Sequence, residues 1–160
     1  MSRVSVAAVR TPCLRRAVAD YTQVLGFQCT QHVPGVFARL LHGPLCVQLW
    51  ACGAVPGRWE RPAPGDRGFE PGHHRVDVAG IHALQASLRQ AVLGPCRTGL
   101  AGRTLLHAHR LAADAPQWQP WGAWETTLTD IDGNVLHLFD RAACHPGAPA
   151  PQRPGAEVRG

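Results

Sequence analysis

Tryptophan is the residue type in this sequence best suited to binding a small molecule. The chain contains five Trp, four Phe and one Tyr. Trp50 ends a predicted strand, Trp59 lies in a Pro- and Gly-rich segment, and Trp118 lies in a loop rich in Pro and Gln. These three indole rings could line a cleft for a flat or cationic ligand, by stacking or cation–π contact. Trp121 and Trp124 fit better as plugs at a sheet edge, which is a structural role.

Three histidines and one glutamine could bind a ligand or a metal ion. His73 and His74 open a predicted strand, either as one metal ligand beside a neighbour or as a partly exposed pair, and we favour the exposed pair. His137 alternates with apolar residues, where its ring would bind a ligand or complete a hydrogen bond in the core. Gln48 shares a strand face with Trp50, and a polar side chain on a pocket face is expected to contact ligand or water.

Two arginines on predicted strands raise the question of an anionic ligand. Arg39 and Arg75 could reach into a cavity and select a negatively charged molecule, although arginines on strands are more often solvated. Asp77 lies close enough in sequence to pair with Arg75.

Composition excludes several classes of protein. The 160 residues suffice for one domain with its own core, and the net charge of +5 comes from scattered arginines rather than a basic stripe. No apolar run approaches the ~18 residues of a membrane span, and residues 1–10 do not read as a secretory signal. We therefore expect a cytoplasmic protein that binds neither nucleic acid nor membrane. The six cysteines contain no C-x-x-C pair and are expected to be reduced.

The first fifty residues predict the order strand–helix–strand–strand–strand. Thr11 and Pro12 have the residue types of a helix N-cap and first helical position, and Gly26 those of a C-terminal glycine. The helix carries one apolar stripe: Leu14, Val18, Tyr21 and Leu25. Strands are expected at 2–9, 27–33, 36–41 and 45–50, and residues 52–72 form a linker.

The second half repeats this order with little sequence identity. A strand at 73–78 precedes a helix with the stripe Ile81, Leu84, Leu88 and Val92, closed by Gly94 and Pro95. Strands are expected at 103–112, 124–129 and 135–139, with 113–122 as loop. Asp132 and Gly133 supply the positive φ angles of a tight hairpin. Residues 142–160, rich in Pro, Gly and Ala, are expected to be a disordered tail.

Two motifs in this order resemble the vicinal oxygen chelate superfamily, and within it the glyoxalase/bleomycin resistance/dioxygenase group. They are Tyr21-x-x-x-Leu25-Gly26-Phe27, and Pro120-Trp121-Gly122-Ala123-Trp124-Glu125 followed by Asp130-x-Asp132-Gly133-Asn134. The resemblance covers residues 3–141. It implies an α+β fold in which two tandem βαβββ modules form a curved, eight-stranded mixed sheet around a pocket, commonly completed by a dimer partner. One domain then spans 1–141, with modules 1–51 and 73–141.

The resemblance also implies where a metal would bind. Its ligand positions fall on Val6, Gln48, His73 and His137, where metal enzymes of the group carry His or Gln, Glu, His or Gln, and Glu. The first residue here is aliphatic and both carboxylates are missing, which removes the charge neutralisation a divalent ion needs.

The leading hypothesis is therefore a homodimeric binding protein of the bleomycin-resistance type, without cofactor and without catalysis. It would sequester an aromatic or amphipathic ligand and so protect the cell. The expected ligand-binding residues are Val6, Gln48, Trp50, Trp118 and His137. The alternative is a metal-dependent lyase, isomerase or dioxygenase in which His73, His137 and Gln48 hold Zn²⁺, Ni²⁺, Mn²⁺ or Fe²⁺. A third option is an interaction module with a vestigial pocket.

Overall fold

The computed structural model describes residues 4–63, 68–93 and 107–141. The predicted tail at 142–160 lies outside these ranges. The elements, in order, are β1 (Ser5–Thr11), α1 (Leu14–Gln23), β2 (Gln28–Val33), β3 (Phe37–His42), β4 (Leu45–Ala51), β5 (His73–Asp77), α2 (Ile81–Leu93), the 3-10 helix η1 (Ala108–Arg110), β6 (Gln117–Gln119), β7 (Ala123–Thr129) and β8 (Val135–Asp140). Within the described ranges, no helix combines the length and apolar character needed to cross a membrane.

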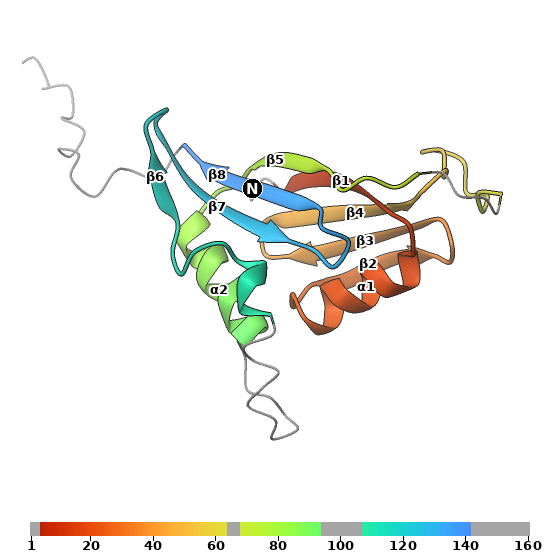
Figure 1. The fold of residues 1–160 in the computed structure, drawn as a ribbon, viewed down its shortest axis with the longest axis horizontal. Helices are drawn as coiled ribbons and strands as arrows, with labels where there is room; N and C mark the ends of the chain where they lie inside the picture. Colours follow the sequence, from red (N-terminus) through yellow and green to blue (C-terminus); the bar gives the residue numbers. More distant parts are fainter. Residues whose placement is uncertain (1–3, 64–67, 94–106, 142–160) are drawn as a thin grey trace, which may run out of the picture.

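The strands form two four-stranded mixed sheets with the same topology. Their orders are β1-β4-β3-β2 and β5-β8-β7-β6, with one parallel pair in each, β1 with β4 and β5 with β8. The two sheets meet where β1 lies beside β5 (Figure 1). There the Ser5 hydroxyl donates a hydrogen bond to the Asp77 carbonyl. This α+β arrangement of two βαβββ units confirms the predicted fold class.

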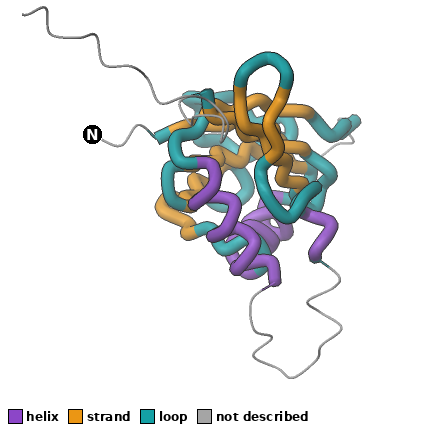
Figure 2. Tube along the Cα trace, turned by 90° about the vertical axis from the view of Figure 1, so that its left-hand side faces the viewer, coloured by secondary structure: helices purple, strands orange, loops and turns teal. Residues whose placement is uncertain are grey.

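Both helices pack on the same side of the strands (Figures 1 and 2). The predicted stripes are confirmed: of the α2 stripe all four residues are buried, and of the α1 stripe only Val18 is half-buried. Along β4 the alternation sends Leu45, Val47 and Leu49 into the common core. Gln48 and Trp50 therefore lie on the opposite side of the sheet, which we call the helix-free face.

Three local predictions are wrong, each for a tertiary reason. Residues 107–112 contain η1 rather than a strand, because the Arg110 N–H bonds to the His107 carbonyl and its side chain turns inward. Strand β6 lies inside the expected loop 113–122, where edge pairing with β7 tolerates flanking prolines. In the β7–β8 hairpin only Gly133 has positive φ, at 84°, and Asp132 does not.

The start of α1 also differs from the prediction. The helix begins at Leu14 with Cys13 as its N-cap residue, two positions later than expected. Thr11 instead ends β1, where its hydroxyl accepts the Cys13 N–H at 3.2 Å and donates to Asp132 at 2.7 Å. Gly26 follows the helix as predicted, with φ of 75°, and the Phe27 N–H bonds to the Tyr21 carbonyl.

The two sequence motifs meet where helix α1 contacts the turn between β7 and β8. The Tyr21 hydroxyl donates to Asp130 Oδ2 at 3.0 Å, and the Asp130 carboxylate also accepts the Asn134 N–H. Beside them, Arg110 forms a buried ion pair with Asp20 at 2.6 Å. We call Asp20, Tyr21, Arg110 and Asp130 the module interface, because they join residues of the two halves.

Burial shapes the acid–base properties of the module interface. It raises the pKa of the Asp130 carboxyl above its ordinary value, against the opposing effect of hydrogen bonds from Asn134 and Tyr21. It also raises the pKa of Tyr21 well above the usual range, with the charge of Asp130 adding to the shift. The phenol therefore stays protonated and acts as a hydrogen-bond donor.

Candidate functional site

Three aromatic rings gather on the helix-free face of the first sheet. Phe37 on β3 lies opposite Trp50 on β4, with ring centroids 4.6 Å apart. Trp59, from the segment after β4, stacks on Trp50 at 5.8 Å with an interplanar angle of 19°, and its ring lies 5.5 Å from Phe37. Trp50 is buried, whereas 56% of Trp59 is exposed. We call Phe37, Trp50 and Trp59 the aromatic cluster.

A cavity of about 350 Å³ opens beside the aromatic cluster. Its lining combines the outer strand of the sheet with two rings of the cluster: Gln31, His32, Val33, Phe37 and Trp59. The exposed face of Trp59 therefore borders a space large enough for a small molecule.

Polar side chains continue the same face along β3 and β4. Gln48 lies opposite Arg39, two pairs further along the ladder than Phe37 and Trp50, and both polar side chains are half-buried. The Arg39 Nε–H points to Cys46 Sγ at 3.3 Å, which holds the guanidinium on this face. The face thus changes from aromatic to polar within two pairs of residues.

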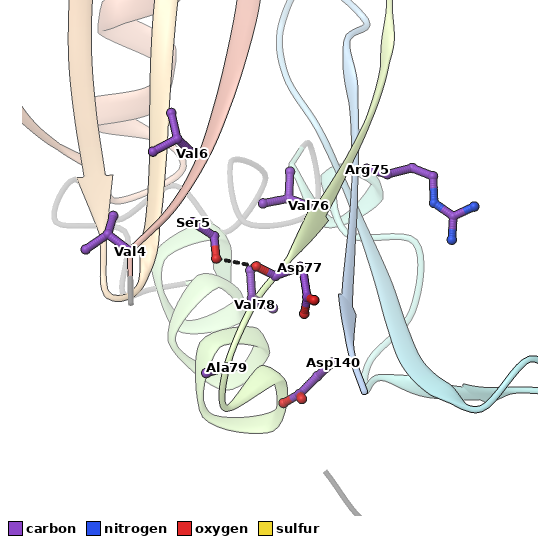
Figure 3. Close-up of a pocket in the computed structure, with 9 residues that line it drawn as sticks. All are labelled: Val4, Ser5, Val6, Arg75, Val76, Asp77, Val78, Ala79 and Asp140. Carbon is purple, nitrogen blue, oxygen red and sulfur yellow. Dashed lines mark hydrogen bonds between the residues drawn. The ribbon is translucent and has the colours of Figure 1, made fainter. Parts of the chain in front are cut away.

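A second cavity, of about 520 Å³, lies between β1 and β5 where the two sheets meet (Figure 3). It is lined by Val4, Ser5, Val6, Arg75, Val76, Asp77, Val78, Ala79 and Asp140. Val6, predicted to bind the ligand, lies here rather than beside the aromatic cluster, and half of it is exposed.

The helix-free face of the second sheet carries a chain of three titratable groups. His73 Nδ1 lies 2.9 Å from His137 Nε2, and the two rings stack with centroids 5.2 Å apart. Behind them, His137 Nδ1 lies 3.3 Å from Glu125 Oε1. Next to this chain, burial lowers the pKa of His74 below its ordinary value, and the nearby His73 adds to the shift.

The indole rings of the second sheet form separate contacts. Trp118 on β6 meets Trp124 at 5.5 Å. Trp121 packs against Phe139, and the Arg75 guanidinium lies 5.0 Å from the Trp121 ring rather than pairing with Asp77 as expected. The predicted trio Trp50, Trp59 and Trp118 is therefore divided between the two sheets, and only the first two rings meet.

Solved structures resemble this fold over nearly its whole length. TioX from Micromonospora sp. ML1 superposes with a TM-score of 0.53 at 16% identity, covering 88% of this chain and 99% of its own. A bleomycin resistance determinant encoded on transposon Tn5 gives 0.54 at 17% identity, with 86% and 97% covered. A bleomycin-binding protein complexed with bleomycin gives 0.51 at 17% identity, with 88% and 98% covered. No family model matches the sequence, and no curated protein matches it either.

The chain has the glyoxalase/bleomycin resistance fold. The four residues expected at the metal-ligand positions lie at three separate places in this fold. Val6 is aliphatic and lines the cavity between the sheets, Gln48 lies on β4, and only His73 and His137 touch. Strand β1 lies between Gln48 on β4 and His73 on β5. Of the predicted set His73, His137 and Gln48, the two histidines are therefore in contact, and Gln48 lies two strands away from His73.

The histidine pair alone does not complete a metal site. Two imidazole nitrogens bound to one tetrahedral ion at ~2.1 Å lie roughly 3.4 Å apart, whereas the His73 and His137 nitrogens lie 2.9 Å apart, at hydrogen-bond distance. Protein metal sites use at least three protein ligands or add substrate and water. Among residues 4–63, 68–93 and 107–141, no three His, Cys, Asp or Glu side chains gather closely enough to hold a metal.

Sequence reasoning missed Phe37 as part of the site. Phe37 and Trp50 lie equally far from the turn at Gly43 and Pro44, so a tight hairpin there would pair them. That register was available from the sequence and would have placed a second ring beside Trp50.

Proposed function

We propose that the protein binds a planar aromatic small molecule on the helix-free face of its first sheet and sequesters it without chemical change. We further propose that it does so in the cytoplasm, as a homodimer whose second copy encloses the ligand. Phe37, Trp50 and Trp59 provide the platform, and Gln48 orients the bound molecule through its amide.

The observation that carries this proposal is the stack of Trp59 on Trp50. An indole that stacks on a buried ring and stays 56% exposed leaves a large apolar surface in water. Covering such a surface with a flat ligand is favourable by roughly 25 cal/mol per Å². The adjoining cavity of 350 Å³ falls within the range of known ligand sites, about 300–1,000 Å³.

The homodimer proposal rests on two exposed valines at the place where the two sheets meet. Val4, just before β1, and Val6, on β1, are 44% and 50% exposed, and both line the cavity between the sheets. Apolar side chains on the open side of a sheet are suited to contact with another copy of the chain. Sedimentation equilibrium of the full chain should give a dimer mass, and a monomer at every concentration would contradict this part of the proposal.

The test of the binding function is calorimetric titration with planar aromatic compounds, comparing two tryptophan variants. Removing one stacking partner should weaken binding about tenfold, so Trp59→Ala should raise the Kd by that factor. Trp118→Ala is the control, because it removes an exposed indole from the other sheet. Equal losses in the two variants would rule out the aromatic cluster as the binding site.

A second candidate is a metal-dependent lyase, isomerase or dioxygenase that uses the histidine pair. The 2.9 Å contact between His73 and His137, with Glu125 behind the second ring, favours it, because a carboxylate commonly orients a metal-binding imidazole. Elemental analysis of protein purified without chelator or tag distinguishes the two functions. About one metal per chain, lost in His73→Ala, would favour the enzyme, and metal-free protein that still binds aromatics would favour sequestration.

A further inference from the structure

The first sheet carries only positive charge on its strands. Strands β1 to β4 contain Arg10 and Arg39 but no Asp or Glu. In residues 4–63 the acidic side chains are Asp20 and Glu60. Asp20 lies under the sheet in a buried pair with Arg110, so it leaves the helix-free face without a negative charge.

Two cations border the aromatic cluster. Arg10, on β1, lies opposite Trp50 in the ladder, and its guanidinium donates to the carbonyls of Ala51 and Ala54 at 3.1 and 2.6 Å. Arg39 lies two residues beyond Phe37 on β3, opposite Gln48.

An acidic residue beside the cluster, Glu60, is outnumbered by arginines. Glu60 is exposed and follows Trp59 directly, between Arg58 and Arg61, so this short segment keeps a net positive charge. On the neighbouring strand β5, Asp77 contacts Ser5 at the start of β1. Arg10 and Trp50 lie at the other end of the pair formed by β1 and β4.

The spacing along the strands matches a molecule with a ring at one end and a charge at the other. Side chains two residues apart on one strand face are separated by about 6.6 Å. Trp50, Gln48 and Cys46 succeed one another on β4 in this way, and Arg39 reaches Cys46. A flat ring on the aromatic cluster would therefore project a substituent past the Gln48 amide to the Arg39 guanidinium.

We propose that the ligand of this face is a planar aromatic anion, with its ring against the exposed Trp59 of the aromatic cluster and its carboxylate or sulfonate against Arg39. This inference rests on the proposed binding function and specifies the ligand class. An arginine presents several N–H donors in a fixed fork that matches an oxyanion. A cationic ligand could stack on the same indoles but would be repelled by Arg10 and Arg39. Strands β1 to β4 carry no carboxylate to pair with it.

Three naphthyl compounds of matched size test the charge preference by calorimetry. They are 2-naphthylacetate, 2-naphthylacetamide and 2-(2-naphthyl)ethylammonium, which differ in charge and share the ring. The anion should bind at least tenfold more tightly than the neutral amide, as expected for one charge-assisted hydrogen bond to arginine. Raising the salt concentration should weaken binding of the anion and leave the amide unchanged.

Three arginine variants test whether Arg39 is the charge that favours the anion. Arg39→Gln should abolish the preference for the acetate over the amide. Arg15→Gln is the control, since it removes the same charge from an exposed position of α1, on the other side of the sheet. Arg39→Lys keeps the charge and should retain part of the preference, which covers the case in which the glutamine variant does not fold.

The outcomes separate this inference from the function on which it rests. Tighter binding of the acetate that depends on Arg39 supports both. Equal or tighter binding of the amide or the ammonium compound overturns the anionic ligand and leaves aromatic binding intact. If none of the three compounds binds, the proposed function itself fails and the ligand class fails with it.

Discussion

The Tyr21 phenol is enclosed on all sides and donates its only hydrogen to the Asp130 carboxylate. Ionising it would create a second negative charge beside that carboxylate, in a buried site. The same buried carboxylate accepts the Asn134 N–H, and the Asn134 amide in turn donates to the Arg10 carbonyl at 3.0 Å. Tyr21, Asp130 and Asn134 therefore join the two modules, and the proposed ligand face does not depend on their charge.

Alkaline titration should show this burial directly, because Tyr21 is the single tyrosine of the chain. Burial raises the pKa of the folded state above the ordinary value of 10.0, so the native state holds the proton more tightly than the unfolded chain. Stability is then complete below pH 10 and is lost as the pH rises further. Absorbance at 295 nm should stay flat past this pH and rise together with unfolding. A reversible tyrosinate signal near pH 10 in folded protein would contradict the buried phenol.

At the scale of elements, a close contact at one glycine determines how the two helices pack against each other. Gly26, just after α1, has a φ of 75°, and a methyl group placed on it would lie 2.6 Å from the Ala91 Cβ of α2. The neighbouring His42 ring bonds to the Gly26 carbonyl and to the Ser87 hydroxyl, each at 2.8 Å. Helix α2 of the second module therefore rests on the end of the first helix.

Gly26→Ala should destabilise the fold through both strain and collision. The positive φ alone costs an L-residue about 1–2 kcal/mol. Gly122→Ala provides the control, because Gly122 has a φ of 89° with no atom within 4 Å of an added methyl group. Urea denaturation should show a clearly larger loss of stability for Gly26→Ala than for Gly122→Ala. Equal losses would mean that α2 moves aside at no cost.

Elements with strong local signals could be predicted from the sequence, and those defined by distant partners could not. The ends of β3, β4, β7 and β8 lie within one residue of the prediction, because alternation and turn residues mark them. Strand β6 has three residues, too few to show alternation. At the site, Trp50 and Trp59 were recognised from their types. Trp118 is separated from Trp50 and Trp59 because of the order of the strands, and the residues around Trp118 do not reveal that order.

At the scale of the whole molecule, the two modules share one hydrophobic core and one buried ion pair. The core cluster combines residues of α1 and β4 with residues of α2 and β8. The Asp20 and Arg110 side chains are 2% and 5% exposed, and Asp20 also accepts the Ile131 N–H at 3.0 Å. A buried ion pair of this kind stabilises the fold little compared with apolar side chains of similar size. Removing one partner is costly, because it leaves the other charge buried and unpaired.

Arg110→Met should therefore destabilise the protein by about 3–5 kcal/mol, measured by chemical denaturation. Adding Asp20→Asn to this variant should recover much of the loss, because no unpaired carboxylate remains. Arg89→Met is the control for losing an arginine, since Arg89 forms an exposed pair with Asp114. A loss in Arg110→Met no larger than in Arg89→Met would show that Asp20 finds another partner or water.

The ion pair, the phenol and the packed glycine all lie on the helix side of the sheets, opposite the proposed ligand face. Substitutions on the two sides should therefore have largely independent effects on stability. Positions such as Gln31, Arg39 and Gln48 could be randomised together in a combinatorial library while the framework stays folded. The chain would then serve as a scaffold for selecting receptors for new small molecules.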